Sequence, residues 1–175
     1  IIKKYPCCGS NHGALDALIA LANDHQISVT DVARVDVDNL PAISHVLLHP
    51  DPSCGFQGKF SIHYSIATAL VDRRIDIASF SDAAFNRPEY RAARDKTHIN
   101  VMSNWDPDYE NAPTYNPVTI TLKDGKKVSA RVSRHTMHGS PADPLSEQEL
   151  KNKFRYCGRM CLPDSQVEEA IDAWW

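Results

Sequence analysis

A short segment near the start of the chain gathers residue types that could do chemistry. Residues 3–12 read KKYPCCGSNH and include two lysines, two cysteines and one histidine. The pattern predicts a helix that begins soon after Gly9, and a helix start offers free backbone N–H groups and the positive end of the helix dipole. With Lys3 nearby, such a junction suits a carboxylate or a phosphate. The alternative is that Lys3 and Lys4 are solvated strand-edge charges and that His12 is an ordinary polar residue at a helix start.

Zinc binding is the other chemistry that these cysteines and this histidine suggest. A structural zinc site needs four ligands, and Cys7, Cys8 and His12 have no second pair nearby in the sequence. Cys157 and Cys161 would have to join them in space. We therefore expect no metal. Because no Walker, GxGxxG, GxSxG or HExxH motif occurs, we also expect no cofactor.

A second group of candidate residues lies on an apolar segment in the middle of the chain. His63 and Tyr64 stand among Phe60, Ile62 and Ile66 in a stretch with helical spacing. Polar groups on such a helix need partners. Either Tyr64 or His63 faces a cleft as a proton donor, or Tyr64 is a satisfied core residue and His63 lies at the surface.

The spacing of apolar residues predicts the elements that must position these groups. Helices are expected over 11–24 and 60–73, the second buried on nearly every side. Two strands around a Lys-Asp-Gly-Lys turn, 118–122 and 127–132, predict an antiparallel hairpin. The other expected elements are strands over 1–5, 27–37 and 99–102, helical pieces over 79–85 and 88–95, helices over 146–160 and 164–175, and loops over 38–58 and 106–117.

Polar residues at the helix starts indicate how the helices begin. Ser10 or Asn11 is expected to cap the first helix. Ser146 and Glu149 have the spacing of a capping box. Either residue 164 or residue 165 is expected to cap the last helix.

Composition narrows the class of protein. The 175 residues are 42% hydrophobic and 23% charged with a net charge of −3, which excludes a disordered, collagen-like or coiled-coil chain and offers no basic excess for nucleic acid or an anionic membrane. The longest apolar stretch, 14–22, is too short to span a bilayer. Five cysteines, an odd number, indicate reduced thiols and a cytoplasmic location. Interspersed strands and helices indicate an α+β fold.

Three strings in this order resemble the C-terminal part of the MmgE/PrpD family. They are KKYPCCGSNHGALDAL, GKFSIHYSIATALVDRRID, and DGKKV followed by GSPADPLSEQELKNKF, and the match covers roughly residues 1–160. The family includes 2-methylcitrate dehydratases, cis-aconitate decarboxylases and iminodisuccinate epimerases. The resemblance implies an α+β lid domain over 1–144, an antiparallel sheet with packed helices, followed by helices over 145–175 that return to a helical domain absent from this chain. It also implies a homodimer.

The resemblance assigns roles residue by residue. The lysine of the family's K-x-[YF]-P motif falls on Lys3, the histidine after the P-C-C segment on His12, and the tyrosine of the buried helix on Tyr64. These three residues are therefore expected to be catalytic, with Lys3 also binding substrate.

Three further residues are implied as substrate contacts. Cys8 matches a position that is histidine in some decarboxylase-like members. Ser61 belongs to the F-S part of the buried-helix motif, and His63 lies beside it in the same string.

The implied reaction is that of a lyase on a small di- or tricarboxylate. Dehydration, decarboxylation and epimerisation in this family all pass through a carbanion or enolate beside a carboxylate, which needs a fixed positive charge where negative charge develops. A family epimerase is the alternative activity. A non-catalytic fragment or subunit that pairs with a helical partner, in the same protein or a separate chain, is the alternative of a different class.

Overall fold

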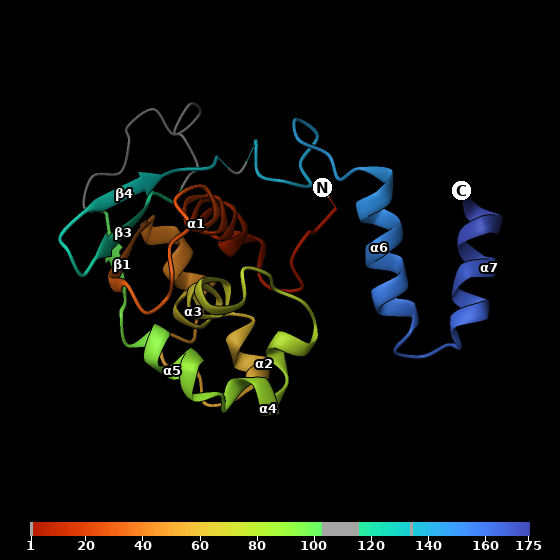
Figure 1. Ribbon diagram of the computed structural model, residues 1–175, viewed down its shortest axis with the longest axis horizontal. Helices are drawn as coiled ribbons and strands as arrows, with labels where there is room; N and C mark the ends of the chain where they lie inside the picture. The colour runs from red at the N-terminus through yellow and green to blue at the C-terminus, as the bar shows by residue number, and fades with distance from the viewer. Residues whose placement is uncertain (1, 103–115, 134) are drawn as a thin grey trace.

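A four-stranded sheet lies to the left of two central helices, α1 (His12–Asp24) and α3 (Ile62–Asp72), in the view of Figure 1. The structure is a computed structural model that describes residues 2–102, 116–133 and 135–175. The strand order is β2-β1-β3-β4. The strands are β1 (Val32–Asn39), β2 (Thr97–Val101), β3 (Val118–Leu122) and β4 (Lys127–Ala130).

The sheet confirms the α+β class and refines it. The β1–β3 and β3–β4 pairs are antiparallel, as expected, and the second is the predicted hairpin. The β1–β2 pair is parallel, so the sheet is mixed rather than antiparallel. A parallel neighbour requires a long crossover connection, and the helices between residues 40 and 96 supply it. Val35 and Val37 are fully buried while the intervening Asp36 is not, so one face of β1 lines the core.

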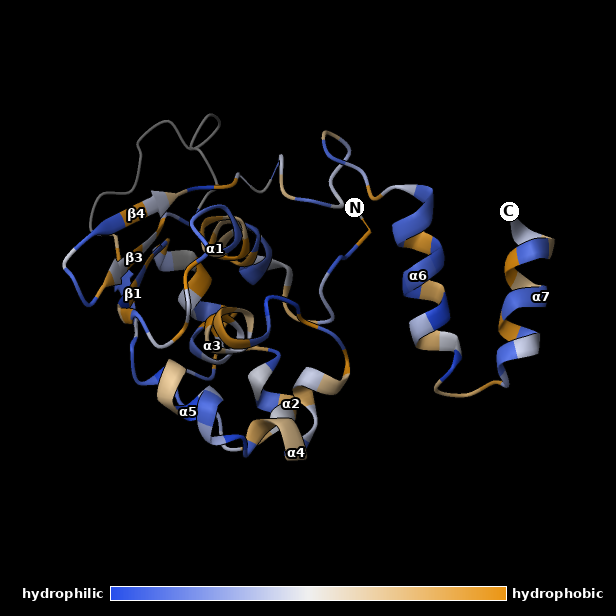
Figure 2. Ribbon diagram, in the orientation of Figure 1, coloured by the Kyte–Doolittle hydropathy of each residue, from blue (hydrophilic) through white to orange (hydrophobic). Residues whose placement is uncertain are grey.

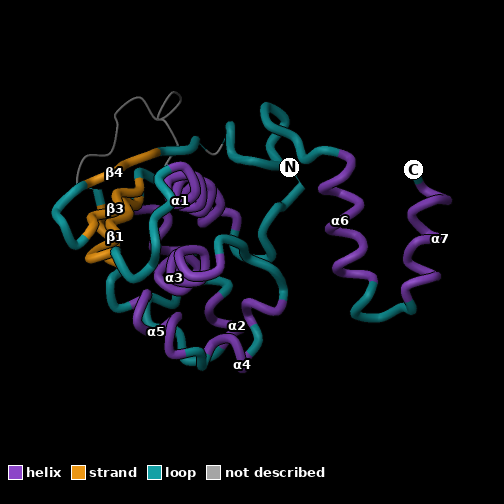
Figure 3. The backbone as a smooth tube through the Cα atoms, in the orientation of Figure 1, coloured by secondary structure: helices purple, strands orange, loops and turns teal. Residues whose placement is uncertain are grey.

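Two helices cover that face and run parallel to each other. They are α1 (His12–Asp24) and α3 (Ile62–Asp72), both confirmed from the sequence. At one end the Asn11 side-chain amide donates to the Ser65 hydroxyl at 3.0 Å. At the other end the Arg73 guanidinium donates to the Ile27 carbonyl. Because each bond joins like ends, both helices begin at the same edge of the domain, and Figure 3 shows the two side by side next to the strands.

Short helical segments fill the connections between these elements. The expected pieces over 79–85 and 88–95 are confirmed as η3 with α4, and α5. The expected loop over 38–58 contains η2 and α2, and residues 106–115 of the other expected loop lie outside the described residues. The bounds are η1 (Gly9–Asn11), η2 (Pro41–His45), α2 (Gly55–Gly58), η3 (Ala78–Phe80), α4 (Asp82–Phe85) and α5 (Pro88–Arg94).

Three local predictions are wrong: one strand and two helix caps. Residues 2–5 are not a strand, because the only backbone–backbone hydrogen bond that joins this segment to another part of the described chain is that from the Ile2 N–H to the Gly139 carbonyl, at 3.0 Å. Side-chain caps at α1 and at the last helix are also absent. The Asn11 side chain turns to Ser65 instead, and the last helix follows Pro163 without a side-chain cap.

The last two helices stand apart from the sheet and its covering helices (Figure 1). They are α6 (Glu147–Gly158), which has no buried residue, and α7 (Asp164–Trp174). The predicted capping box of Ser146 and Glu149 is confirmed. Figure 2 shows hydrophilic residues along both helices, with hydrophobic residues at intervals between them. Among the described residues, no helix is long and apolar enough to cross a membrane.

One histidine ties the start of α6 to the body of the domain. His138 Nδ1 lies 2.9 Å from an oxygen of Asp143, and Nε2 lies 2.6 Å from an oxygen of Glu149. The backbone N–H of His138 donates to Asp16 of α1 at 2.9 Å. The bond to Glu149, followed by that to Asp143, raises the pKa of His138 despite partial burial. The same bond and those from Ser146 lower the pKa of Glu149 to about 2.

We predict that this contact gives the chain a pH-dependent stability. A raised histidine pKa stabilises the fold fully below about pH 6.5, the unfolded value, and the gain is lost as pH rises through the folded value. The lowered pKa of Glu149 acts above its ordinary 4.5 and is lost as pH falls toward about 2. His138→Gln should therefore lower the free energy of unfolding more at about pH 5.5 to 6 than at about pH 9. Urea unfolding at the two pH values measures the difference.

A matched control is His135→Gln, because His135 is exposed in the same loop and its side chain contacts no carboxylate among the described residues. This variant should show no such pH dependence. An equal loss for His138→Gln at both pH values would contradict the prediction.

Candidate functional site

Lys3 is held beside the start of α1 by contacts from three parts of the chain. Its ammonium donates to the Cys7 carbonyl at 3.2 Å, and its stem lies next to Gly9. Its own carbonyl accepts from Lys153 of α6. The preceding residue, Ile2, is bonded to Gly139, whose φ of +93° suits glycine and where a Cβ would clash with the Ile2 carbonyl. The Lys3 side chain itself is exposed.

Buried polar groups without hydrogen-bond partners among the described residues lie in the same segment as this lysine. His12 is 1% exposed, and neither ring nitrogen has a hydrogen-bond partner among the described residues. Its ring meets the edge of Tyr5 at a centroid distance of 5.2 Å. Asn11 is fully buried, and its side-chain oxygen is also unpaired there. Unsatisfied buried groups are rare in folded proteins and often mark functional positions.

Burial sets the protonation of this cluster. It lowers the pKa of His12, with Lys3 adding to the effect and Asp16 opposing it, so the imidazole is neutral at pH 7. Burial also raises the pKa of Cys7 to about 12, which keeps that thiol protonated. Cys8 is half-buried, and its N–H donates to the Lys59 carbonyl at 2.9 Å, which ties the cluster to the segment leading into α3.

The arrangement favours an anion. The N–H groups of Gly9 and Ser10 open the helical run that becomes α1 and donate to no partner among the described residues. The positive ends of α1 and α3 meet at this edge, and Lys3 adds a full positive charge. Lys3, Cys8 and His12, which the sequence grouped as site residues, are thus brought together. We call this group, with Asn11, the junction site.

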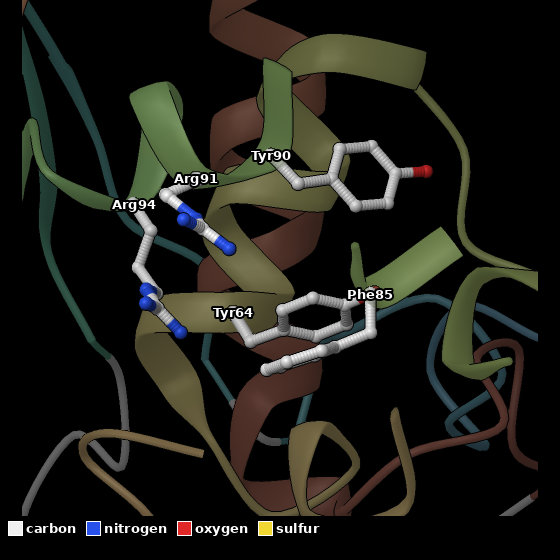
Figure 4. Close-up of a pocket in the computed structure, with 5 residues that line it drawn as sticks. All are labelled: Tyr64, Phe85, Tyr90, Arg91 and Arg94. Carbon is white, nitrogen blue, oxygen red and sulfur yellow. The ribbon is translucent and has the colours of Figure 1, made fainter. Parts of the chain in front are cut away.

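Tyr64 does not belong to the junction site. It is 1% exposed, and its hydroxyl donates to the Ser79 carbonyl at 2.7 Å. Its ring packs on Phe85 and Tyr90, at centroid distances of 5.4 and 5.8 Å (Figure 4). The prediction that Tyr64 faces a cleft as a proton donor is therefore wrong, and the alternative of a satisfied core tyrosine is confirmed. Burial raises its pKa to about 12.

The space beside Tyr64 is too small for a substrate. A cavity of about 20 Å³ lies between Tyr64, Phe85, Tyr90 and two arginines of α5, Arg91 and Arg94. That volume holds about one water molecule. Lys3 does not line this cavity, nor the pockets beside His63 and Lys4.

Ser61 has a structural task. It is fully buried, and its hydroxyl accepts the N–H of Tyr64 as the cap of α3. Ser61 was expected to contact substrate, and in this chain its full burial and its bond to the start of α3 place it in the helix cap instead. His63 lines a pocket, but not one that includes Lys3.

Sequence reasoning missed Asn11 as a site residue and Ser65 as its partner. The two are 54 positions apart, and no local pattern joins them. A signal existed in each segment, since both are polar residues on faces that are otherwise apolar. Among the described residues, no group of three or more histidine, cysteine or acidic side chains could hold a metal ion.

Comparison with known proteins gives a family match over nearly the whole chain. The family model described as the MmgE/PrpD C-terminal domain matches residues 5–175. The match includes Cys8, Asn11 and His12 of the junction site, and it begins two residues after Lys3.

Three curated relatives are similar to the chain at low identity. The cis-aconitate decarboxylase of Homo sapiens is 28% identical over 97% of this chain, that of Mus musculus 27% over 97%, and that of Aspergillus terreus (strain NIH 2624 / FGSC A1156) 26% over 98%. The aligned region is 35% of the human and mouse proteins and 36% of the fungal one. The chain thus spans about a third of the length of these relatives.

Removing the Tyr64 hydroxyl tests its structural role. We predict that Tyr64→Phe lowers the free energy of unfolding by about 1 kcal/mol or more, because the Ser79 carbonyl then loses its buried donor. Urea unfolding measures the change. Tyr156→Phe is the comparison, because that hydroxyl lies nearer the surface and should cost less. An unchanged stability in Tyr64→Phe would contradict the assignment of Tyr64 to the core.

Proposed function

Because this chain belongs to the MmgE/PrpD family, as a C-terminal domain of it, we propose that it supplies one wall of the active site of a lyase. The substrate is a small di- or tricarboxylate, and the relatives' names suggest cis-aconitate or a close analogue. Removal of carbon dioxide is the favoured reaction for the same reason. The domain provides the charge that binds carboxylate and stabilises the intermediate.

The observation that carries the proposal is the position of Lys3. An exposed ammonium lies at the edge where two parallel helices begin, in the same segment as buried groups that lack hydrogen-bond partners among the described residues. A fixed cation and free N–H groups are what an enolate or carbanion beside a carboxylate requires. The reorganisation needed is limited, because Lys153 bonds to the Lys3 carbonyl, the preceding residue Ile2 is bonded to Gly139, and the Lys3 ammonium donates to the Cys7 carbonyl.

The chemistry of the reacting bond fits this charge distribution. When the carbon–carbon bond to a leaving carboxylate breaks, carbon dioxide departs and the electron pair remains on carbon. An adjacent carboxylate shares that pair, and Lys3 faces the resulting charge. A proton then quenches the carbon. We propose His12 as the relay for that proton: one nitrogen of its neutral imidazole gives its proton to the carbon while the other nitrogen takes one from a water molecule, since both nitrogens lack a hydrogen-bond partner among the described residues.

The junction site needs a second wall. Lys3 is exposed and lines none of the pockets beside Tyr64, His63 or Lys4, so the substrate must be enclosed from the other side. We propose that a helical domain, in the same protein or a separate chain, provides it. The helices α6 and α7 then pack on that domain, because Phe154 and both terminal tryptophans are exposed on them.

Three properties of the whole enzyme accompany the proposal. We propose a homodimer and a reaction that needs no cofactor, as the family resemblance implies. We also propose a cytoplasmic location, which the five free cysteines support.

The test uses the complete polypeptide that carries this chain. Product analysis by NMR in deuterated buffer should show loss of carbon dioxide from cis-aconitate or a related acid. An epimerase would instead exchange a hydrogen and invert its carbon. Exchange and inversion without a lost carboxyl group would contradict the lyase assignment.

Lys3→Ala should lower kcat/KM in that polypeptide by about 100-fold or more, the order expected for losing one stabiliser of a developing anion. Lys4→Ala is the matched control, because Lys4 pairs with Asp16 at 3.7 Å and lines a different pocket. Its turnover should stay within a few-fold of wild type. Equal effects of the two substitutions would remove Lys3 from the mechanism.

A further inference from the structure

Several polar clusters outside the junction site are already satisfied. Asp72 accepts from Arg87 and from the Tyr90 hydroxyl, so the groove beside them is lined by paired charges. The groove beside Lys4 is similar, because Tyr5 and Lys4 both contact Asp16 there. These groups have little hydrogen-bonding capacity left for a ligand.

A different pocket lies where the two parallel strands end. It has a volume of about 350 Å³ and lies against Asn39 and Val101, the last paired residues of β1 and β2. The first turn of α3, with Ile62 and His63, forms another wall. Ligands of sheets with parallel strands bind at this end, and the volume falls in the range of small-molecule sites.

The pocket wall is apolar and carries no full charge. Six of its described lining residues are apolar, and none is lysine, arginine, aspartate or glutamate. Leu48 and Val101 are 65% and 58% exposed, so large apolar side chains at the pocket meet water in this chain. A polycarboxylate gains nothing from such a wall, because its charges would lose water without meeting a cation. The six apolar residues are Leu47, Leu48, Pro50, Ile62, Ile99 and Val101.

Three described residues of this wall are polar: Asn39, Ser44 and His63. The Asn39 side-chain oxygen already accepts from Asn116 at 2.6 Å, and Ser44 is exposed to water, so His63 is the partly buried polar group of the wall.

The His63 side chain makes no hydrogen bond to the described residues, and its Nδ1 is buried. Burial lowers its pKa, with Arg94 and His98 adding to the effect and Asp51 opposing it, so the imidazole is neutral at pH 7. A neutral imidazole offers one donor and one acceptor. The sequence resemblance assigned His63 to polycarboxylate binding, whereas the structure places it in an uncharged pocket.

We propose that this pocket, which we call the His63 pocket, binds a small uncharged molecule with an apolar body and a single hydroxyl or carbonyl group. The apolar body lies against the leucines, isoleucines and Val101, and the polar group bonds to the imidazole of His63. The site is separate from the junction site and takes a ligand of opposite character. This inference does not depend on the proposed lyase activity.

Three probes that share one ring but differ in the attached group test the proposal on the whole chain. They are benzyl alcohol, toluene and benzoate. Benzyl alcohol should bind with a Kd on the order of 1 mM, as expected for so small a ligand. Toluene should bind about tenfold more weakly, because it cannot form a hydrogen bond with the imidazole of His63. Benzoate should not bind at this pocket. Saturation-transfer NMR gives the affinities, and ¹⁵N spectra of the histidine rings locate the contact at His63.

Two variants separate the hydrogen bond from the apolar contact. His63→Phe keeps a ring in the wall, so benzyl alcohol should weaken to the affinity of toluene while toluene is little changed. His25→Phe, at an exposed position after α1, is the matched control and should leave all three affinities unchanged. Thermal unfolding verifies that both variants fold.

The affinities of the three probes for the wild-type chain test the proposal even if His63→Phe does not fold. Preferential binding of benzoate, equal binding of benzyl alcohol and toluene, no saturable binding of any probe, or ring shifts confined to histidines other than His63 would each overturn the proposal.

Discussion

The parallel packing of α1 and α3 on one face of the sheet is the constraint from which the functional features follow. The bond from Asn11 to Ser65 joins their starts, and the bond from Arg73 to the Ile27 carbonyl joins their ends. Because helix dipoles add when helices begin together, the edge that holds Lys3 is electropositive even though the chain carries a net negative charge. Opposed helices would have cancelled this field.

The junction site and one pocket of different chemistry border the start of α3. On one side its first turn meets the junction site through Ser65, where charge and unpaired polar groups gather. On another side Ile62 and His63 line an uncharged pocket. The buried cap Ser61 fixes the helix start between them. One well-satisfied helix terminus thus separates a charged group of residues from an uncharged pocket.

Local patterns in the sequence predicted the helices, the hairpin and the capping box, because those elements depend on residues within a few positions of one another. The position of Lys3 and His12 near a helix start was predicted for the same reason. The direction of Tyr64 was not, because its helix is apolar on nearly every side and any face could have met the core. The non-strand conformation of residues 2–5 depends on Gly139, far along the chain.

Gly139 limits which mutations this domain can tolerate, although it is a loop residue. It lies outside the junction site and would be passed over as a loop residue, yet a methyl group there would push the Ile2 carbonyl away and carry Lys3 with it. The position of Lys3 therefore depends on this glycine as well as on the polar residues of the junction site. A homologous chain that keeps the lysine but has lost this glycine would retain the family signature while its ammonium sits in another place.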